Sequence, residues 1–371
     1  MIIGCVKELT NNELRVGITP ENANEYIQNG HQVFMETGAG LGSGFTDESY
    51  LSYGAHILPS ALQVWEKSEM IIKVKEPLTQ EFDLLQEGQI LYAYLHLAAN
   101  QAAAKALIDK KVTAVAYETL EDQNGNLPLL KPMSEIAGRL SIQIGARFLE
   151  APMGGMGILL GGVTGVKKAN IVIIGAGVAG SNACKAAINF GAVVTVMDKN
   201  LNKLAYLDDL YGSKIQTQHS SDTAIEQVLQ GADLIICSAL RVGASAPKLI
   251  KRSYLSSMKK GSVIVDIAID QGGCAETSRP TTHANPTYVV DDVIHYCVTN
   301  MPGAVPMTST LALTNATLDT GLRIGARGLE NALRRYPLLA TGINTYQGHM
   351  TNAALAKQYQ LPYHDVLELI S

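Results

Sequence analysis

The sequence lacks the long apolar run of a transmembrane helix and the short motifs of several common enzyme chemistries. No stretch of about 18 consecutive apolar residues occurs in its 371 residues, so we expect no membrane span. The patterns H-E-x-x-H, G-x-S-x-G and G-x-x-x-x-G-K-S/T are also missing. We therefore expect no zinc-protease, serine-nucleophile or P-loop chemistry.

Charge and cysteine are scarce as well. Charged residues make up 17% of the chain and the net charge is −5, which gives no reason to expect a nucleic-acid partner. The five cysteines are scattered and no C-x-x-C pair occurs, which predicts buried free thiols in a reducing compartment. Lys7 and Glu8 interrupt the first apolar stretch, so we expect no signal peptide and a cytoplasmic location. What is present, 47% hydrophobic residues over 371 positions, suits a globular protein of two domains.

The segment Asn170–Asp198 has the order of a dinucleotide-binding unit. The β-branched run Ile171–Ile174 predicts a buried strand, and a G-x-G-x-x-G turn and a helix follow it. A second strand, Val193–Met197, ends at Asp198. A lone glycine motif is a weak signal, and a flavodoxin-like or purely structural turn stays open. The complete order favours dinucleotide binding.

The glycines of this turn have separate expected roles. Gly175 permits a tight turn, Gly177 lets the main chain approach a pyrophosphate, and Gly180 lets the helix pack on the strand. The start of that helix offers free N–H groups to phosphates. Asp198 can accept hydrogen bonds from ribose hydroxyls and would repel a 2′-phosphate, so NAD is favoured over NADP.

Strands and helices alternate along the rest of the chain, which predicts an α/β fold of two Rossmann-like domains. We expect residues 131–306 to form a nucleotide-binding domain with a doubly wound parallel sheet. It would be inserted between residues 1–130 and 307–371, which form the other domain. Two long helices would join the domains, one capped by Ser134 and one over Thr308–Arg335.

Three further strands bear on the site. Ile90–Leu97 alternates and would place Tyr92, Tyr94 and His96 on one face. Val263–Ile269 and Tyr288–Val290 are expected in the nucleotide-binding domain.

Four side chains could carry chemistry near the predicted strand ends. Asp270 follows a strand of the nucleotide-binding domain and could steer water, or it could simply cap a loop. His96 could move protons, or it could be an ordinary core histidine. Lys75 and Arg15 could hold a carbonyl oxygen and a carboxylate, or they could face solvent. Together the four suit an amino or oxo acid.

A set of longer motifs runs from residue 6 to about residue 310. They are VKELTNNELRVGITP, KVKEP, LYAYLHLA, PMSEIAGRLSIQIGA, GILLGGVTGV, IGAGVAG, DIAIDQGG and HYCVTNMPGAVPMTST. Through them the chain resembles the alanine dehydrogenase and nicotinamide nucleotide transhydrogenase α-subunit family. The dehydrogenase branch is favoured because the transhydrogenase subunit typically has glutamate at the position of Asp270 and no histidine matching His96. It also carries membrane segments.

The resemblance implies roles for individual residues. Arg15 and Lys75 resemble the substrate-binding pair, His96 the proton donor and acceptor, and Asp270 the acid that works with water. Residues 1–130 and the chain end would then form the substrate domain, which closes on the domain that binds NAD. Besides the three glycines, the positions where the family contacts NAD are Ser134, Val178, Ala179, Asp198, Lys203, Ser220, Ala239, Leu240, Ile267, Ala268, Ile269, Asp270, Arg279, Val298, Thr299, Asn300 and Met301.

Three places depart from the family pattern, in which glycine is usual at Asp292, arginine at Met307, and alanine followed by leucine at Gly17 and Ile18. A divalent metal has been linked to some members near the second long helix. Arg323 and Arg327 are poor ligands there, so we expect no metal. The family also suggests a homohexamer.

The reaction that the resemblance implies is the reversible oxidative deamination of L-alanine, in which NAD⁺ and water give pyruvate, ammonium and NADH. The expected partners are therefore small molecules. Two alternatives stay open: another small-amino-acid dehydrogenase or a cyclodeaminase of the same superfamily, and a non-catalytic NAD-binding subunit.

Overall fold

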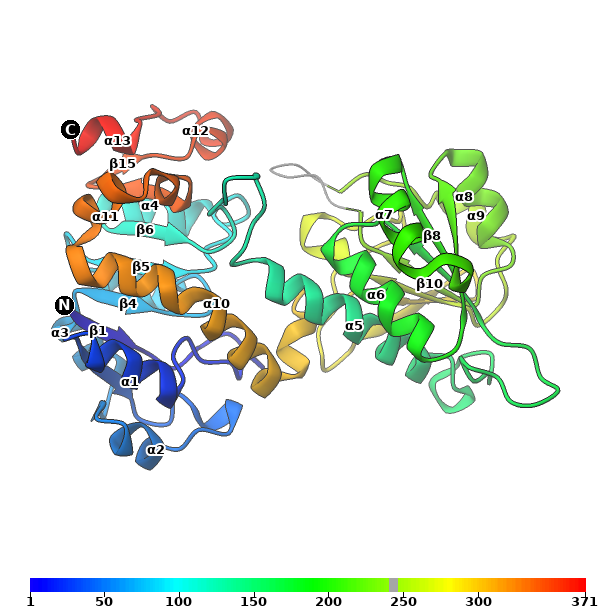
Figure 1. Ribbon diagram of the computed structural model, residues 1–371, viewed down its shortest axis with the longest axis horizontal. Helices are drawn as coiled ribbons and strands as arrows, with labels where there is room; N and C mark the ends of the chain where they lie inside the picture. Colours follow the sequence, from blue (N-terminus) through cyan, green and yellow to red (C-terminus); the bar gives the residue numbers. More distant parts are fainter. Residues whose placement is uncertain (240–245) are drawn as a thin grey trace. The chain divides into compact units, whose positions relative to one another are not determined.

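The computed structural model of the chain describes residues 1–239 and 246–371, and it divides into two compact units (Figure 1). Unit 1 comprises Met1–Met133 and Val305–Ser371, and unit 2 comprises Ser134–Ala304. Each unit contains a mainly parallel sheet with flanking helices. The expected α/β class with two Rossmann-like domains is therefore confirmed.

The sheet of unit 1 has the strand order β15-β14-β6-β5-β4-β1-β2-β3. Its parallel strands are β1 (Ile2–Cys5), β2 (Gln32–Glu36), β3 (His56–Leu58), β4 (Met70–Ile72), β5 (Ile90–Ala93) and β6 (Thr113–Ala116). β14 (Ile343–Tyr346) pairs antiparallel with β6, and β15 (His349–Met350) pairs antiparallel with β14. The end of the chain thus extends the sheet that its beginning forms.

Helices cover both faces of this sheet. They are α1 (Pro20–Gln28), α2 (Asp47–Ser52), α3 (Ala61–Lys67), α4 (Gln101–Asp109), α10 (Pro306–Arg327), α11 (Leu329–Arg335), α12 (Ala353–Tyr359) and α13 (Val366–Leu369). Trp65 of α3 and Leu107 of α4 share one core cluster with Leu91 of β5. The next residue of β5, Tyr92, points to the other face, where its Oη donates to the carbonyl of Thr317 on α10.

The sheet of unit 2 has the strand order β12-β13-β11-β10-β7-β8-β9. The parallel strands are β7 (Asn170–Ile174), β8 (Val193–Asp198), β9 (Ile215–His219), β10 (Leu234–Cys237), β11 (Val263–Asp266) and β13 (Val293–Tyr296), and β12 (Thr287–Val290) is antiparallel to β13. The helices are α5 (Lys131–Phe148), α6 (Val178–Asn189), α7 (Leu201–Tyr211), α8 (Asp222–Leu229) and α9 (Arg252–Leu255). The order reverses direction at β7, next to the glycine turn, as in doubly wound folds.

Local signals in the sequence explain several of these elements. Thr19 caps α1, since its side chain accepts a hydrogen bond from the N–H of Asn22, and Pro20 occupies the first helical position. The five cysteines are all buried and free, as expected. In the described ranges no helix is long and apolar enough to cross a membrane.

Two predicted strands end early. The strand predicted over Ile90–Leu97 stops at Ala93, because His96 adopts a left-handed backbone with φ 46° that no strand continues. The strand predicted over Val263–Ile269 stops at Asp266 and turns into a 3₁₀ helix, Ile267–Gln271. In both cases apolar periodicity runs past the strand end because the following turn is buried as well.

The two long helices also differ from the prediction. α5 begins at Lys131, so Ser134 lies inside its first turn and does not cap it. The helix predicted over Thr308–Arg335 is two helices separated at Gly328, where φ is 72°. β13 was missed in the prediction. Asp292, just before it, has φ 63°, which explains why glycine is usual there in the family.

Candidate active site

Lys75 and His96 approach each other at one edge of the unit 1 sheet. They follow the adjacent parallel strands β4 and β5, three residues beyond Ile72 and Ala93. Because parallel strands end at the same edge, the two loops lie side by side. Lys75 Nζ is 3.4 Å from His96 Nε2, and the rings of Tyr94 and His96 stack with centroids 6.1 Å apart.

The imidazole of His96 is held in its neutral form. Burial is the largest cause, and together with the ammonium of Lys75 and the guanidinium of Arg15 it lowers the pKa of His96 to about 3. At neutral pH this side chain can therefore accept a proton, which is the first requirement for a general base.

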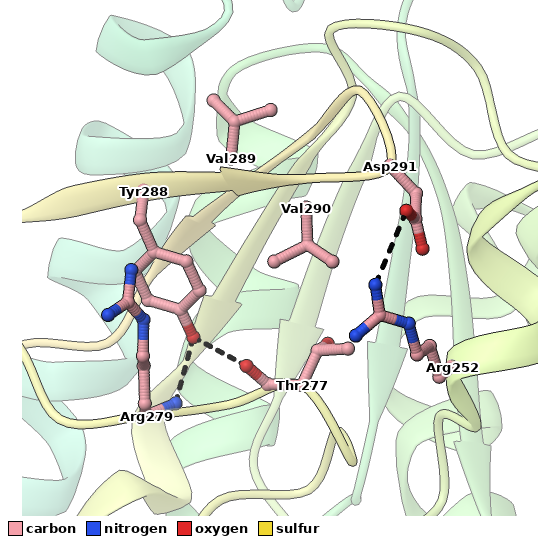
Figure 2. A pocket seen from close by; sticks show the side chains of 7 residues that line it. All are labelled: Arg252, Thr277, Arg279, Tyr288, Val289, Val290 and Asp291. Atoms are coloured by element: carbon pink, nitrogen blue, oxygen red, sulfur yellow. Dashed lines mark hydrogen bonds and ion pairs between the residues drawn. The ribbon is translucent and has the colours of Figure 1, made fainter.

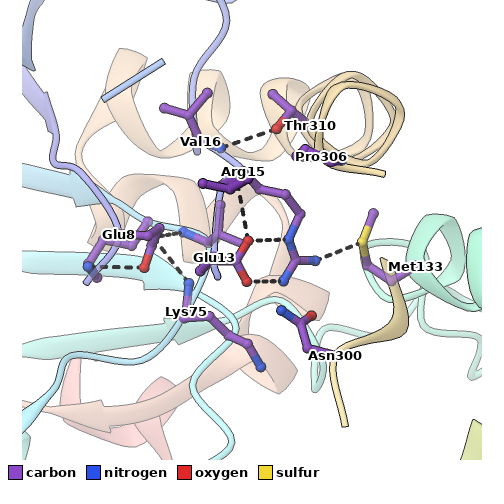
Figure 3. Close-up of polar contacts among 12 residues, drawn as sticks. Glu8, Glu13, Arg15, Val16, Lys75, Met133, Asn300, Pro306 and Thr310 are labelled. Atoms are coloured by element: carbon purple, nitrogen blue, oxygen red, sulfur yellow. Dashed lines mark hydrogen bonds and ion pairs between the residues drawn. The ribbon is translucent and has the colours of Figure 1, made fainter. Parts of the chain in front are cut away.

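Arg15 lies close by on the loop before α1, and it is buried and paired (Figure 3). Its Nη2 and Nε lie 2.6 and 2.7 Å from the two carboxylate oxygens of Glu13, and its Nη1 is 3.2 Å from the sulfur of Met133. Burial opposes its charge, but the hydrogen bond and the charge of Glu13 raise its pKa. The guanidinium is therefore charged and fixed in one plane.

A second group of buried charges supports Lys75. The ammonium of Lys73, which is fully buried, lies 2.9 Å from Glu81 and 3.3 Å from Glu8. The carboxylate of Glu8 also accepts hydrogen bonds from the N–H groups of Val74, at 2.6 Å, and Lys75, at 3.3 Å (Figure 3). Glu8 thus ties the start of the Lys75 loop to the buried ion pair.

Sequence reasoning missed Glu8, Glu13, Lys73 and Glu118, which make the polar contacts around the predicted residues. One signal was available: Lys73, directly after β4, interrupts the apolar run of residues 70–74, and a charge in a buried segment requires a partner. Nothing in the local pattern identifies which carboxylates supply it.

The glycine turn of unit 2 has the geometry that its three glycines predict. Gly175 has φ 108°, and a Cβ there would lie 2.8 Å from the nitrogen of Ala239. A Cβ at Gly180 would collide with the carbonyl oxygen of Gly175, whereas one at Gly177 would meet nothing within 4 Å. The space beside Gly177 is therefore open, and the first N–H groups of α6 border it.

Most of the predicted NAD contacts follow the carboxyl ends of parallel strands of unit 2. Asp198 ends β8, Ser220 follows β9, Ala239 follows β10, Ile267–Asp270 follow β11, and Val298–Met301 come after β13. Parallel strands end at one edge, so the structure gathers these positions there. Leu240, also predicted, lies outside the described residues.

Asp198 and Ser220 are linked at this edge. Asp198 accepts hydrogen bonds from the N–H groups of Ala176, at 2.7 Å, and Asn200, at 2.8 Å, so part of its carboxylate holds the glycine turn. Its carbonyl accepts from the N–H of Ser220 at 3.0 Å. Lys203 is exposed in the first turn of α7, and Ser134 lies near the start of α5.

The 3₁₀ helix that carries the exposed Asp270 is fixed by a buried carboxylate that the prediction overlooked. Asp266 accepts hydrogen bonds from the N–H groups of Ala268, at 3.1 Å, and Cys274, at 2.7 Å, and from Ser278 Oγ. Burial raises its pKa, and the hydrogen bonds oppose that change. The hydrogen bonds of Asp266 thus fix the main chain of the turn that carries Asp270.

Arg279 follows Ser278, whose hydroxyl donates to Asp266 at the end of β11, and its side chain lines a pocket of about 490 Å³ (Figure 2). Its guanidinium carbon is 4.2 Å from the centre of the Tyr288 ring, and its N–H donates to Tyr288 Oη at 2.8 Å. Across the pocket, Arg252 pairs with Asp291 at 3.6 Å. In the part of the chain that the structure describes, no group of three or more His, Cys, Asp or Glu side chains could hold a metal ion.

Known proteins resemble this chain over almost its full length. The C-terminal domain of alanine dehydrogenase/PNT matches residues 141–353, and the N-terminal domain of the same family matches residues 4–137. An alanine dehydrogenase of Methanococcus maripaludis is 53% identical over 98% of both chains. One of Bacillus subtilis is 51% identical over 98% of this chain and 96% of that one.

Solved structures give the same picture. An L-alanine dehydrogenase with 48% identity has a TM-score of 0.94 and covers 97% of this chain and 99% of its own. A transhydrogenase from Sinorhizobium meliloti, 24% identical, has a TM-score of 0.83 with 95% and 100% coverage. Because this transhydrogenase is only 24% identical, its similarity supports the fold alone.

Proposed function

The chain belongs to the alanine dehydrogenase/PNT family, and from this premise we propose that it catalyses the reversible oxidative deamination of L-alanine. L-alanine, NAD⁺ and water would give pyruvate, ammonium, NADH and a proton. The observation that carries the proposal is the contact of 3.4 Å between Lys75 and His96, with an imidazole that is neutral at the pH of the reaction. Relatives that are 51–53% identical over almost their full length are named alanine dehydrogenases.

Arg15, Lys75, His96 and Asp270 would bind the substrate and move its protons. Arg15 and Lys75 would hold the carboxylate of L-alanine. When hydride has left Cα, water adds to the iminium carbon, and Asp270 or His96 removes a proton from that water. His96 then shuttles the proton that lets the carbinolamine release ammonia, while Lys75 stabilises the oxygen that becomes the carbonyl.

Unit 2 would hold NAD, which supplies the hydride acceptor. The open space beside Gly177 and the start of α6 suit a pyrophosphate, because a glycine there leaves room and N–H groups face it. The carboxylate of Asp198 at the end of β8 suits the ribose hydroxyls. The other predicted positions at the same strand ends would complete the site, together with Ser134, Lys203 and Arg279.

The family also supports finer expectations about the assembly. We infer that residues 1–130 and 307–371 serve as the substrate domain and residues 131–306 as the NAD domain. We further infer a homohexamer in the cytoplasm, with small molecules as its other partners and no metal. Size-exclusion chromatography with light scattering tests the hexamer directly.

An NAD⁺-reduction assay tests the activity. Purified protein is given L-alanine, glycine, L-serine, L-ornithine and L-lysine at high pH, and NADH is followed by its absorbance. We expect turnover with L-alanine that falls about 10²- to 10⁴-fold in His96→Ala and strongly in Asp270→Asn, with NADH binding retained in His96→Ala. Preference for L-ornithine would indicate a cyclodeaminase, and tight NADH binding without turnover a non-catalytic subunit.

A further inference from the structure

We propose that Glu118 is a positioning residue that holds the main chain of His96 in the conformation needed for proton transfer. The inference deepens the proposed function and rests on its assignment of His96. Glu118 lies two residues beyond Ala116, the last residue of β6, which pairs in parallel with β5. The two chains therefore leave the sheet at the same edge, and the side chain of Glu118 reaches the loop that carries His96.

The carboxylate of Glu118 accepts hydrogen bonds from two consecutive N–H groups of that loop. Oε1 lies 2.6 Å from the nitrogen of His96, and Oε1 and Oε2 lie 3.1 and 3.2 Å from the nitrogen of Leu95. The preceding residue, Tyr94, still bonds to the neighbouring chain segment, because its N–H donates to the carbonyl of Val74 at 3.1 Å. Without Glu118 the next two N–H groups would lose their acceptors at a partly buried place.

These bonds matter because the backbone of His96 is strained. Its φ of 46° lies in the left-handed region, which residues other than glycine seldom adopt and which surrounding contacts must stabilise. Directly after it the chain turns, and the N–H of Ala99 donates to the carbonyl of His96 at 2.9 Å. The carboxylate fixes the start of this turn and thereby directs the imidazole toward Lys75.

The geometry gives Glu118 no direct part in the chemistry. Both carboxylate oxygens face main-chain N–H groups, and the imidazole contacts Lys75 and Tyr94 instead. Burial raises the pKa of Glu118 above its usual value, and the hydrogen bonds from these N–H groups oppose that rise by favouring the charged form. Glu8 makes the same kind of contact with the N–H groups of Val74 and Lys75. At this sheet edge, therefore, two carboxylates each accept hydrogen bonds from two consecutive main-chain N–H groups.

Glu118→Gln tests the inference, because the amide keeps the size of the side chain but turns an N–H₂ group toward one of the main-chain donors. We expect kcat with L-alanine to fall about 10- to 100-fold, since small displacements of a catalytic group have effects of this size. NADH affinity, which depends on unit 2, stays unchanged. The matched control is Glu330→Gln, which removes a carboxylate that accepts from Tyr346 Oη elsewhere in unit 1, and it keeps full activity.

A double-mutant cycle separates positioning from general stability. If Glu118 acts through His96, Glu118→Gln causes no further loss of kcat in a His96→Ala background. Equal fold losses in the two backgrounds would overturn the inference. In protein labelled with ¹³C-histidine, the His96 signal of Glu118→Gln should titrate at a higher pH than in the parent, since the released ring gains solvent. An unchanged His96 titration would also overturn the inference.

The labelled-histidine measurement needs no turnover. A parent protein without NADH formation would therefore refute the proposed function and leave the positioning of His96 still measurable.

Discussion

Unit 1 holds its candidate catalytic side chains with buried charges, whereas unit 2 shapes its candidate cofactor site with main chain. In unit 1, Arg15 is paired with Glu13, and the loops of Lys75 and His96 are tied to the carboxylates of Glu8 and Glu118. In unit 2, glycines leave space, strand ends line up, and carboxylates serve mainly to hold N–H groups of turns. Proton transfer needs tuned ionisable groups, while a pyrophosphate needs room and N–H donors.

This difference predicts that unit 1 depends most on its buried charges. Lys73→Met leaves the carboxylates of Glu8 and Glu81 buried without their cation, and we expect a loss of about 3–5 kcal/mol in unfolding free energy. Chemical denaturation measures it. The matched control is Lys105→Met in the exposed pair with Asp109, where about 0–1 kcal/mol is expected. Similar losses in both variants would show that burial gives Lys73 no special weight.

Space for the main chain should be the sensitive quantity in unit 2. Gly180→Ala places a methyl group against the carbonyl oxygen of Gly175, and we expect a loss of about 1–3 kcal/mol in stability together with weaker NADH binding. Gly177→Ala is the informative partner, because its methyl group meets no protein atom. Its melting temperature should stay unchanged while NADH binding, measured by fluorescence titration, weakens. Unchanged binding in Gly177→Ala would argue against a pyrophosphate at this place.

The same contrast explains what could be predicted from the sequence. The turn of unit 2 is local: strand, glycines, helix and Asp198 follow one another within 29 residues, Asn170–Asp198, so their order alone predicts their arrangement. The cap at Thr19 is local in the same way, and the structure has both. Many of the parallel strands of both sheets also carry apolar runs that identify them, although β13, which contains His295, was missed.

The surroundings of His96 depend on contacts that no local pattern contains. Its left-handed backbone is stabilised by Glu118, which comes from another strand end, and the alternation of the preceding residues predicts a longer strand instead. The partners of Lys73 are Glu8 and Glu81, one before β2 and one in a 3₁₀ turn. Asp270 was expected directly at a strand end, yet a 3₁₀ helix based on Asp266 carries it. Family resemblance, not periodicity, singled out the reactive side chains.

Asp198 combines both features of this comparison, because it is a charged side chain in the unit whose candidate cofactor site is shaped mainly by main chain. Asp198→Ala removes the carboxylate expected to repel a 2′-phosphate, so the ratio of kcat/KM with NAD to that with NADP should fall about tenfold, or about 1.4 kcal/mol. Asp209→Ala, which removes an exposed carboxylate from α7, should leave this ratio unchanged. A fall in activity with both cofactors alike would assign Asp198 to the turn, where it accepts from the N–H of Ala176.

The smallest expected effect concerns how folding stability depends on pH. Burial, with Lys75 and Arg15, lowers the pKa of His96 to about 3 in the folded protein, against about 6.5 in the unfolded chain. Between these values only the unfolded chain binds the proton, so His96 costs stability as pH falls below 6.5. Replacing His96 removes this cost. As the pH falls from 7.5 to 5.5, the unfolding free energy of His96→Gln should therefore rise by about 1 kcal/mol relative to that of the parent.

Urea denaturation across this pH range measures the difference, and taking variant against parent cancels the carboxylates that titrate in both. His56→Gln, which removes an exposed imidazole from β3, is the matched control and should show no comparable gain. Parallel curves for His96→Gln and the parent would mean that His96 takes up its proton in the folded state as readily as in the unfolded chain. Burial and the neighbouring charges of unit 1 would then not lower the pKa of His96. The comparison between the two units would no longer explain why the proposed proton transfer takes place on unit 1.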